Sequence, residues 1–211
     1  MIILALDTCL NACQAAVTRD GVALAVLTEP MQRGHQERLG PMVQEAVAQA
    51  GIRFADIDRI AVTVGPGSFT GLRVGLAFAK GLKLALGVPT IGIGTLEALA
   101  ASAGEGGPAA AVIDGRRGQI YLQTFQDGVA LSGPRTVSPD EARAEVEGQP
   151  KTMVVGPGAG LFPALDGHPL EYADPLAIAR LGEREGGDAS LTPIYLRAPD
   201  AKPQAARVGL G

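Results

Sequence analysis

The stretch GPGSFTGLRVG, residues 65–75, follows an apolar segment and precedes a long helical pattern. Its glycines suggest a phosphate-binding loop, but the spacing does not match one. A Walker A loop requires a lysine after its last glycine, and here Leu72 follows Gly71. A Rossmann loop, G-x-G-x-x-G, has two residues before its last glycine, and here three residues separate Gly67 from Gly71. The glycines therefore predict a sharp strand-to-helix turn, with Ser68 as the helix cap.

The helix expected over residues 69–86 is apolar almost all round. A helix of this kind must be covered on all sides, by its own sheet, by the predicted helix 36–50 or by another chain. Two interpretations stay open: a core formed within the chain, or a protein–protein interface built on these two helices. Gly71 and Gly75 lie four residues apart on one face, which favours close packing over ligand binding.

Outward from this motif, strands and helices alternate along the chain. Ser138, Pro139 and Glu141 form a capping box with proline at the first helical position, which predicts where one helix begins. The expected elements are strands 2–7, 59–64, 89–94, 109–114, 151–160 and 191–197, hairpins 13–27 and 119–131 with Asp-Gly turns, and helices 36–50, 69–86, 95–104, 138–147 and 174–187.

The two halves of the chain repeat one pattern at an offset of 107 residues. The matches are Asp7 with Asp114 and DGVALA (20–25) with DGVALS (127–132), followed by VGPGS (64–68) with VGPGA (155–159). Their shared order predicts an internal duplication with lobes 1–104 and 105–211, divided at the turn-rich EGGP segment. Two like lobes, each with a strand ending in Asp before a hairpin, indicate an α/β fold of the actin-like (ASKHA, ribonuclease H-like) class.

In that class a nucleotide lies in the cleft between the lobes. The candidate cofactor-binding residues are accordingly Asp7, Thr8, Asp114 and Gly115. Turn N–H groups can bind phosphate oxygens, and a strand-end carboxylate can hold a metal ion or its waters. An equally open alternative is that the carboxylates only cap the strand ends. The arginines at 116 and 117 could contact phosphate, a partner's carboxylates, or solvent.

Composition narrows the function classes. Hydrophobic residues make up 46% of the 211 residues, as in a globular protein. A net charge of −4 argues against a protein that binds nucleic acid unaided. Cys9 and Cys13 are expected to be free thiols of a cytoplasmic protein, since we expect neither a signal peptide nor a membrane segment. His35 and His168 do not form a helix-borne metal pair, and no G-x-S-x-G motif supports a hydrolase.

Five segments together resemble the TsaB (YeaZ) family, the accessory subunit of the bacterial machinery that makes threonylcarbamoyladenosine in tRNA. They are ILALDT (3–8), GHQERLGPMV (34–43), GPGSFTGLRVG (65–75), IDGRRGQIY (113–121) and PIYLR (193–197). The resemblance implies the actin-like fold and a heterodimer with the catalytic paralogue TsaD, joined by the ATPase TsaE. The complex transfers threonylcarbamoyl to N6 of adenosine 37. Homodimers also occur in the family.

The resemblance further implies that this subunit is non-catalytic. It would need no cofactor or metal of its own, with ATP and Mg²⁺ used by the wider pathway and tRNA bound only through the complex. The partner interface would fall on the two apolar helices. Carried over residue by residue, it comprises His35, Leu39, Met42, Val43, Ala46, Phe69, Thr70, Leu72, Arg73 and Leu76.

The chain departs from the family pattern in its second lobe. The family turn reads Asp-Ala-Arg-Arg followed by Glu, whereas here Gly115 follows Asp114 and Gln119 replaces the carboxylate. The residues around His35 also differ, which could change partner contacts. The alternative function from another class is a self-sufficient, actin-like ATP-dependent phosphotransferase.

Overall fold

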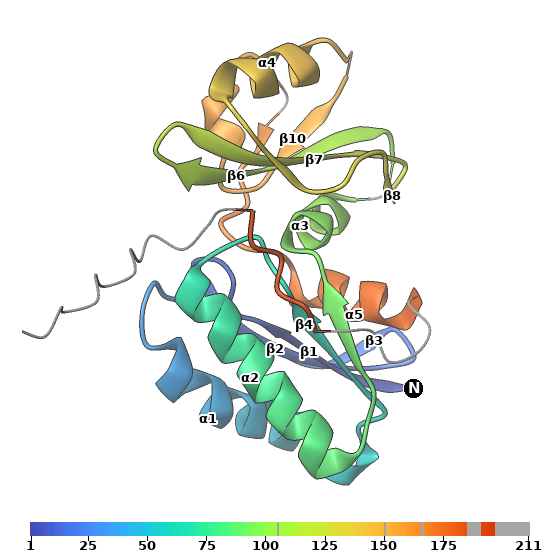
Figure 1. Ribbon diagram of the computed structural model, residues 1–211. Helices are drawn as coiled ribbons and strands as arrows, with labels where there is room; N and C mark the ends of the chain where they lie inside the picture. Colours follow the sequence, from blue (N-terminus) through green and yellow to red (C-terminus); the bar gives the residue numbers. More distant parts are fainter. Residues whose placement is uncertain (105, 150, 166, 185–190, 197–211) are drawn as a thin grey trace, which may run out of the picture.

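A computed structural model describes residues 1–104, 106–149, 151–165, 167–184 and 191–196. The chain forms two α/β lobes, one above the other in Figure 1. The lower lobe holds β1 (Ile2–Asp7), β2 (Ala12–Arg19), β3 (Val22–Pro30), β4 (Arg59–Thr63), β5 (Thr90–Ile93), α1 (His35–Gln49), the short η1 (Phe54–Asp56) and α2 (Phe69–Leu86). The helix α3 (Thr95–Ala103) leads to the upper lobe.

The upper lobe is built around a second sheet. Its elements are β6 (Pro108–Arg116), β7 (Gln119–Gln126), β8 (Val129–Ala130), β9 (Arg135–Val137), α4 (Pro139–Glu147), β10 (Met153–Val155), η2 (Ala159–Leu161) and β11 (Gly167–His168). The helix α5 (Pro175–Arg184) follows and returns to the lower lobe.

The two sheets share one topology. The first has the order β3-β2-β1-β4-β5, and the second, read in the same sense, has β8-β7-β6-β10-β11, with β9 also paired to β7. In each, three antiparallel strands are followed by two strands parallel to the first. This is the ribonuclease H-like arrangement, so the predicted duplicated, actin-like fold is confirmed.

The repeated Asp-Gly pairs make the same turn in both lobes. Asp20 and Gly21 have φ values of 49° and 77°, and Asp127 and Gly128 have 51° and 75°. Positive φ at both central positions is the signature of a type I′ hairpin turn. The two predicted hairpins are therefore confirmed, and local turn chemistry sets the register of each.

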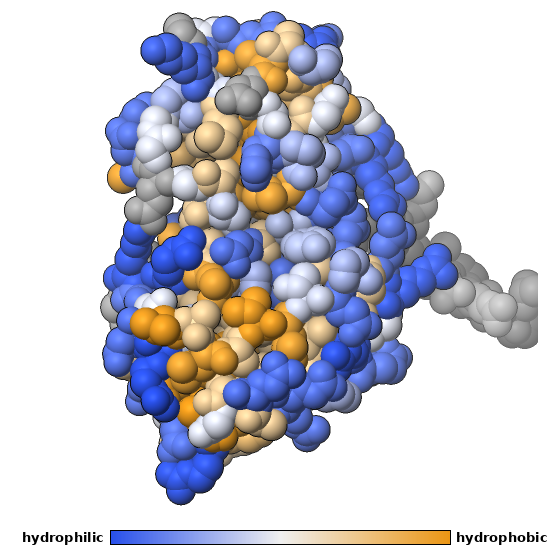
Figure 2. All heavy atoms as spheres, turned by 180° about the vertical axis from the view of Figure 1, so that it is seen from behind, coloured by the Kyte–Doolittle hydropathy of each residue, from blue (hydrophilic) through white to orange (hydrophobic). Residues whose placement is uncertain are grey.

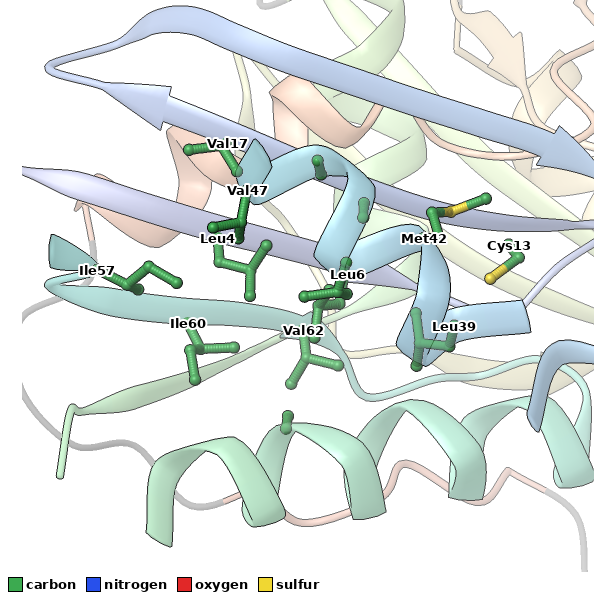
Figure 3. Packing of buried hydrophobic residues seen from close by; sticks show 14 of the residues in the cluster. Leu4, Leu6, Cys13, Val17, Leu39, Met42, Val47, Ile57, Ile60 and Val62 are labelled. Carbon is green, nitrogen blue, oxygen red and sulfur yellow. The ribbon is translucent and has the colours of Figure 1, made fainter. Parts of the chain in front are cut away.

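The first lobe packs α1 and α2 on one face of its sheet. Figure 3 shows Leu4 and Leu6 of β1 on the side of the sheet that α1 covers, and Val62 of β4 pointing toward α2. On the opposite face, α5 packs against β1, β2 and β4, while α3 packs against β6 and β7 of the second sheet. The division of the chain into lobes at residue 104 stays a prediction, and the return of α5 means that the first sheet is covered by a helix from the second half.

Residues 191–196 correct one expected element. The segment was predicted as a strand, but its described residues form none. Instead it joins the lobes: the Ile194 amide donates to the Val64 carbonyl at 2.7 Å, and the Thr136 hydroxyl donates to the Leu196 carbonyl at 3.1 Å. Arg197, the last residue of the predicted strand, lies outside the described residues. One backbone hydrogen bond, from Ile194 to Val64, is not enough to form a strand.

The long helix α2 is only partly covered. Leu72, Leu76 and Ala79 are buried, but Phe69 is 40% exposed and Leu84 is 88% exposed. The interpretation that the chain itself covers this helix on all sides is therefore wrong.

No helix within the described residues is both long and apolar enough to cross a bilayer.

The capping box of α4 generates a stability prediction. The Glu141 amide donates to Ser138 Oγ at 3.2 Å, and the Ser138 amide donates to Glu141 Oε2 at 2.8 Å. Replacing Ser138 by Ala should lower the free energy of unfolding by about 1 kcal/mol, because the helix loses a cap. Ser138→Asp, which also caps, should stay within a few tenths of wild type. Urea denaturation measures both, and equal losses for the two variants would contradict this role.

Candidate functional site

The start of α2 is seated directly on the turn between β1 and β2. The Thr8 hydroxyl donates to the Gly71 carbonyl at 2.7 Å, and the Ser68 amide donates to the Cys9 carbonyl at 2.7 Å. A Cβ added at Gly71 would overlap the Thr8 carbonyl oxygen, and one at Gly67 would overlap that of Cys9. The glycines of residues 65–75 therefore serve a close backbone approach, as their spacing predicted.

The two strand-end aspartates make the same local hydrogen bond. Asp7 Oδ1 accepts the amide of Cys9 at 2.8 Å, and Asp114 Oδ1 accepts the amide of Arg116 at 2.7 Å. Each is an Asx turn, in which the carboxylate caps the backbone two residues on. Capping was one of the two alternatives that the sequence left open, and the geometry favours it in both lobes.

The surroundings of the two carboxyl groups differ sharply. Asp114 is exposed, whereas Asp7 is fully buried and also accepts the Thr63 hydroxyl at 2.5 Å. Burial raises the pKa of Asp7, against the opposing effects of its hydrogen bonds and of nearby His35. The repeat thus places equivalent carboxyls in unlike environments.

A cleft of about 960 Å³ lies between the lobes. It is lined from the first lobe by Asn11, Ser68, Phe69 and Arg73, from the second by Asp114, Gly115, Arg116 and Tyr121, and from the later chain by Glu171 and Tyr195, among others. Asp7 and Thr8 are not among its lining residues. Of the four candidate cofactor residues, the structure brings only Asp114 and Gly115 to the cleft.

Two groups of the β1–β2 turn that could bind a phosphate already have partners within the chain. The Cys9 amide is used by Asp7, and the Thr8 hydroxyl is used by α2. These two groups are therefore not available to a phosphate group. Among the described residues there is also no cluster of three or more His, Cys, Asp or Glu side chains that could hold a metal ion.

An aromatic cluster joins the cleft to the outer face of α2. The Arg73 guanidinium lies 3.8 Å from the Phe69 ring centroid, and its Nε donates to the Tyr195 hydroxyl at 3.2 Å. The rings of Phe69 and Tyr195 are 5.4 Å apart between centroids. Cation–π and ring contacts of this kind hold the segment 191–196 against α2.

A second concavity, which we call the α1/α2 groove, has a volume of about 740 Å³. It is lined by Gln36 and Leu39 of α1 and by Phe69, Thr70, Arg73, Val74, Ala77, Phe78, Gly81 and Leu82 of α2. Apolar side chains dominate this set. Seen from behind, hydrophobic residues gather more on the first lobe than on the second (Figure 2).

The predicted interface is corrected at several positions. Figure 3 shows Leu39 and Met42 pointing into the core rather than outward, and both are 1% exposed. Side chains covered to this extent offer a partner little area, although Leu39 also forms part of the groove lining. The same holds for His35, Val43, Ala46, Leu72 and Leu76, which are all buried. Only Phe69, Thr70 and Arg73 of the predicted set are exposed on the groove.

Sequence reasoning missed several of the groove residues. Val74, Ala77, Phe78 and Gly81 follow Thr70 at helical spacing on the outer face of α2. Their period of three and four was present in the sequence. It was hidden because the opposite face of the helix is equally apolar.

The cysteines fit a structural role. Both are free and buried. Burial raises the pKa of the Cys9 thiol to about 12 and that of Cys13 to about 11. A thiol with such a pKa stays protonated at neutral pH and is a poor nucleophile. The predicted free thiols are confirmed.

These features define a two-lobed, actin-like protein whose β1–β2 turn is hydrogen-bonded to the start of α2 and whose first lobe carries an exposed apolar groove. Comparison with known proteins gives the family. A family model described as TsaD, tRNA N6-adenosine threonylcarbamoyltransferase, matches residues 25–148. An uncharacterised protein of Mycobacterium tuberculosis is 37% identical over 207 residues, covering 96% of this chain and 95% of that protein.

Two further relatives carry family names. The tRNA threonylcarbamoyladenosine biosynthesis protein TsaB of Escherichia coli is 40% identical over 129 residues, which cover 60% of this chain and 55% of that protein. The solved structure of YeaZ from Pseudomonas aeruginosa superposes with a TM-score of 0.79 at 29% identity, over 92% of this chain and 99% of that one. The chain belongs to the TsaB (YeaZ) family.

The seating of α2 is tested by two glycines of the same helix. Gly71→Ala places a methyl group against the Thr8 carbonyl and should cost several kcal/mol of unfolding free energy or prevent folding. Gly81, which has nothing within 4 Å of an added Cβ, is the matched control. Gly81→Ala should stabilise the chain by about 1 kcal/mol. Thermal and urea unfolding measure both, and a harmless Gly71→Ala would contradict the close approach.

Proposed function

We propose that this protein is the non-catalytic scaffold subunit of the machinery that forms threonylcarbamoyladenosine at position 37 of tRNA. It binds a TsaD paralogue through the α1/α2 groove. The observation that carries the proposal is the exposed apolar face of α2, in a chain whose relatives include proteins named for threonylcarbamoyladenosine biosynthesis.

The groove has the physical character of a docking surface. Phe69 is 40% exposed, and Val74, Ala77 and Phe78 continue its apolar strip along α2. A partner helix laid between α1 and α2 would remove this surface from water, which is the usual driving force for helix-in-groove association. Arg73 at the rim could pair with a carboxylate of the partner.

Likeness to the proposed partner supports the pairing. This chain is 38% identical over 107 residues to the tRNA N6-adenosine threonylcarbamoyltransferase of Moorella thermoacetica, covering 43% of this chain and 31% of that protein. Proteins that share a fold can pair through equivalent faces in a pseudo-twofold arrangement, as copies of one chain do. The same groove would then serve a homodimer when the paralogue is absent.

The scaffold role rests on the state of the nucleotide site. Asp7 and Thr8 have partners within the chain, and both cysteines are protonated. The chemistry, with ATP and Mg²⁺, therefore belongs to other subunits, including a TsaE-type ATPase that joins the heterodimer. Contact with tRNA would come through the complex, because a chain with net charge −4 offers little phosphate neutralisation.

Reconstitution tests the function. Purified TsaD paralogue, TsaE and a threonylcarbamoyl donor should modify tRNA with this chain present and not without it, as measured by nucleoside mass spectrometry. Full modification in the absence of the chain would overturn the proposal. So would modification by this chain with no paralogue present.

The groove is tested by Ala77→Glu. Ala77 is exposed, lines the groove and lies outside the core, so the variant should fold normally. Its carboxylate would be buried unpaired under a partner, which should weaken binding to the TsaD paralogue roughly 100-fold, equivalent to about 3 kcal/mol. Calorimetric titration measures this affinity.

The matched control is Ala48→Glu. Ala48 is exposed on α1 but does not line the groove. It receives the same substitution in a helix and should leave the affinity unchanged. Equal affinities for the two variants would place the partner elsewhere.

A further inference from the structure

The two oxygens of the Asp7 carboxyl group differ in their hydrogen bonding. Its Oδ1 accepts both the Thr63 hydroxyl and the Cys9 amide, at 2.5 Å and 2.8 Å. Its Oδ2 is buried and has no hydrogen-bond partner. A buried oxygen that accepts nothing costs free energy, especially if it shares a negative charge.

The adjacent strand, β2, carries a second buried oxygen that has no hydrogen-bond donor. Gln14 is fully buried, and its Nε2 donates to Thr28 Oγ1 at 3.1 Å, while its Oε1 has no partner. Asp7 and Gln14 stand directly opposite each other in the antiparallel register of β1 and β2. Residues so paired project from the same face of a sheet, with Cβ atoms about 4.5–5.5 Å apart. The register therefore places the two unpartnered oxygens on neighbouring strands and on the same face of the sheet.

With Nε2 of Gln14 facing Thr28, Oε1 of Gln14 and Oδ2 of Asp7 are both acceptors, and one proton between them satisfies both. We propose that Asp7 is a neutral carboxylic acid in the folded chain and donates its Oδ2 proton to Oε1 of Gln14. The two donors on Oδ1 fit this arrangement, since they mark Oδ1 as the carbonyl oxygen of the acid. The proposal is independent of the proposed function.

Groups from two other elements and from the following turn also act on Asp7. His35, on α1, acts on the carboxyl through its charge, while Thr63 on β4 and Cys9 in the turn act through hydrogen bonds. All three favour the ionised form. Burial opposes them and is the largest effect, and the net result is a raised pKa for Asp7.

A neutral Asp7 gives the strand-end position a structural role. An uncharged acid offers a cation in the interlobe cleft no electrostatic attraction. The same side chain holds the Cys9 amide, next to the Thr8 hydroxyl that binds α2. The acid–amide pair therefore anchors the turn on which α2 rests, and it does so without burying a charge.

The pH dependence follows from linkage. In the unfolded chain Asp7 has a pKa of about 3.9, and folding raises that pKa. The folded state then binds the proton more tightly, so its contribution to stability is complete below the unfolded pKa and is lost as pH rises through the folded pKa. An asparagine side chain does not ionise, so its contribution to stability does not fall as the pH rises.

Asp7→Asn is the decisive variant. The amide reproduces the proposed geometry, with Oδ1 accepting from Thr63 and Cys9 and Nδ2 donating to Gln14. It should fold, match wild type in acid, and gain in melting temperature over wild type as the pH is raised between about 5 and 8. Asp114→Asn is the matched control, an exposed Asx-turn residue whose offset from wild type should not grow over that range.

Spectroscopy gives an independent readout. In wild-type protein at neutral pH, the ¹³C carboxyl resonance of Asp7, assigned by its loss in Asp7→Asn, should have the chemical shift of a protonated acid. An Asp7→Asn variant that melts below wild type at every pH, or fails to fold, would overturn the proposal. So would a carboxylate resonance for Asp7 at neutral pH, which would mean that the group is ionised and is held by Nε2 of a Gln14 amide turned the other way, by His35, or by a bound cation or water.

Discussion

The contact between the start of α2 and the β1–β2 turn fixes where α2 lies in the first lobe. The Thr8 hydroxyl reaches the Gly71 carbonyl, and the absence of side chains at Gly67 and Gly71 lets the two backbones meet. This one approach positions α2 across the sheet. It also uses the Thr8 hydroxyl of the turn after β1, so one interaction both ties down that turn and sets the position of a helix.

In the second lobe, the repeated segment is followed by a much shorter helix than in the first. The repeated VGPG segment leads into the 18-residue α2 in the first lobe, but only into the three-residue η2 in the second. The second lobe keeps an exposed Asp114 at the cleft, while Asp7 in the first lobe is buried. The two halves thus diverged in complementary ways: one carries the apolar groove, and the other keeps a polar rim on the cleft.

The sequence predicted the fold well because its signals are local. Asp-Gly turns and the capping box at Ser138 act within a few residues, so the hairpins and the start of α4 could be read directly. The interface was predicted less well, because periodicity finds an apolar face without saying what covers it. Leu39 and Met42 cover their own sheet. Asp7 is buried beside Thr63 of β4, which is distant in sequence, and no local pattern reports that burial.

The central claim is that the first lobe does not bind a nucleotide and instead presents α2 as a docking surface. Calorimetric titration of the isolated chain with ATP and Mg²⁺ tests it most directly. The account predicts no saturable binding up to about millimolar nucleotide, because Asp7 and Thr8 are committed within the chain. Stoichiometric binding with a micromolar dissociation constant would contradict it and would favour an ATP-dependent phosphotransferase.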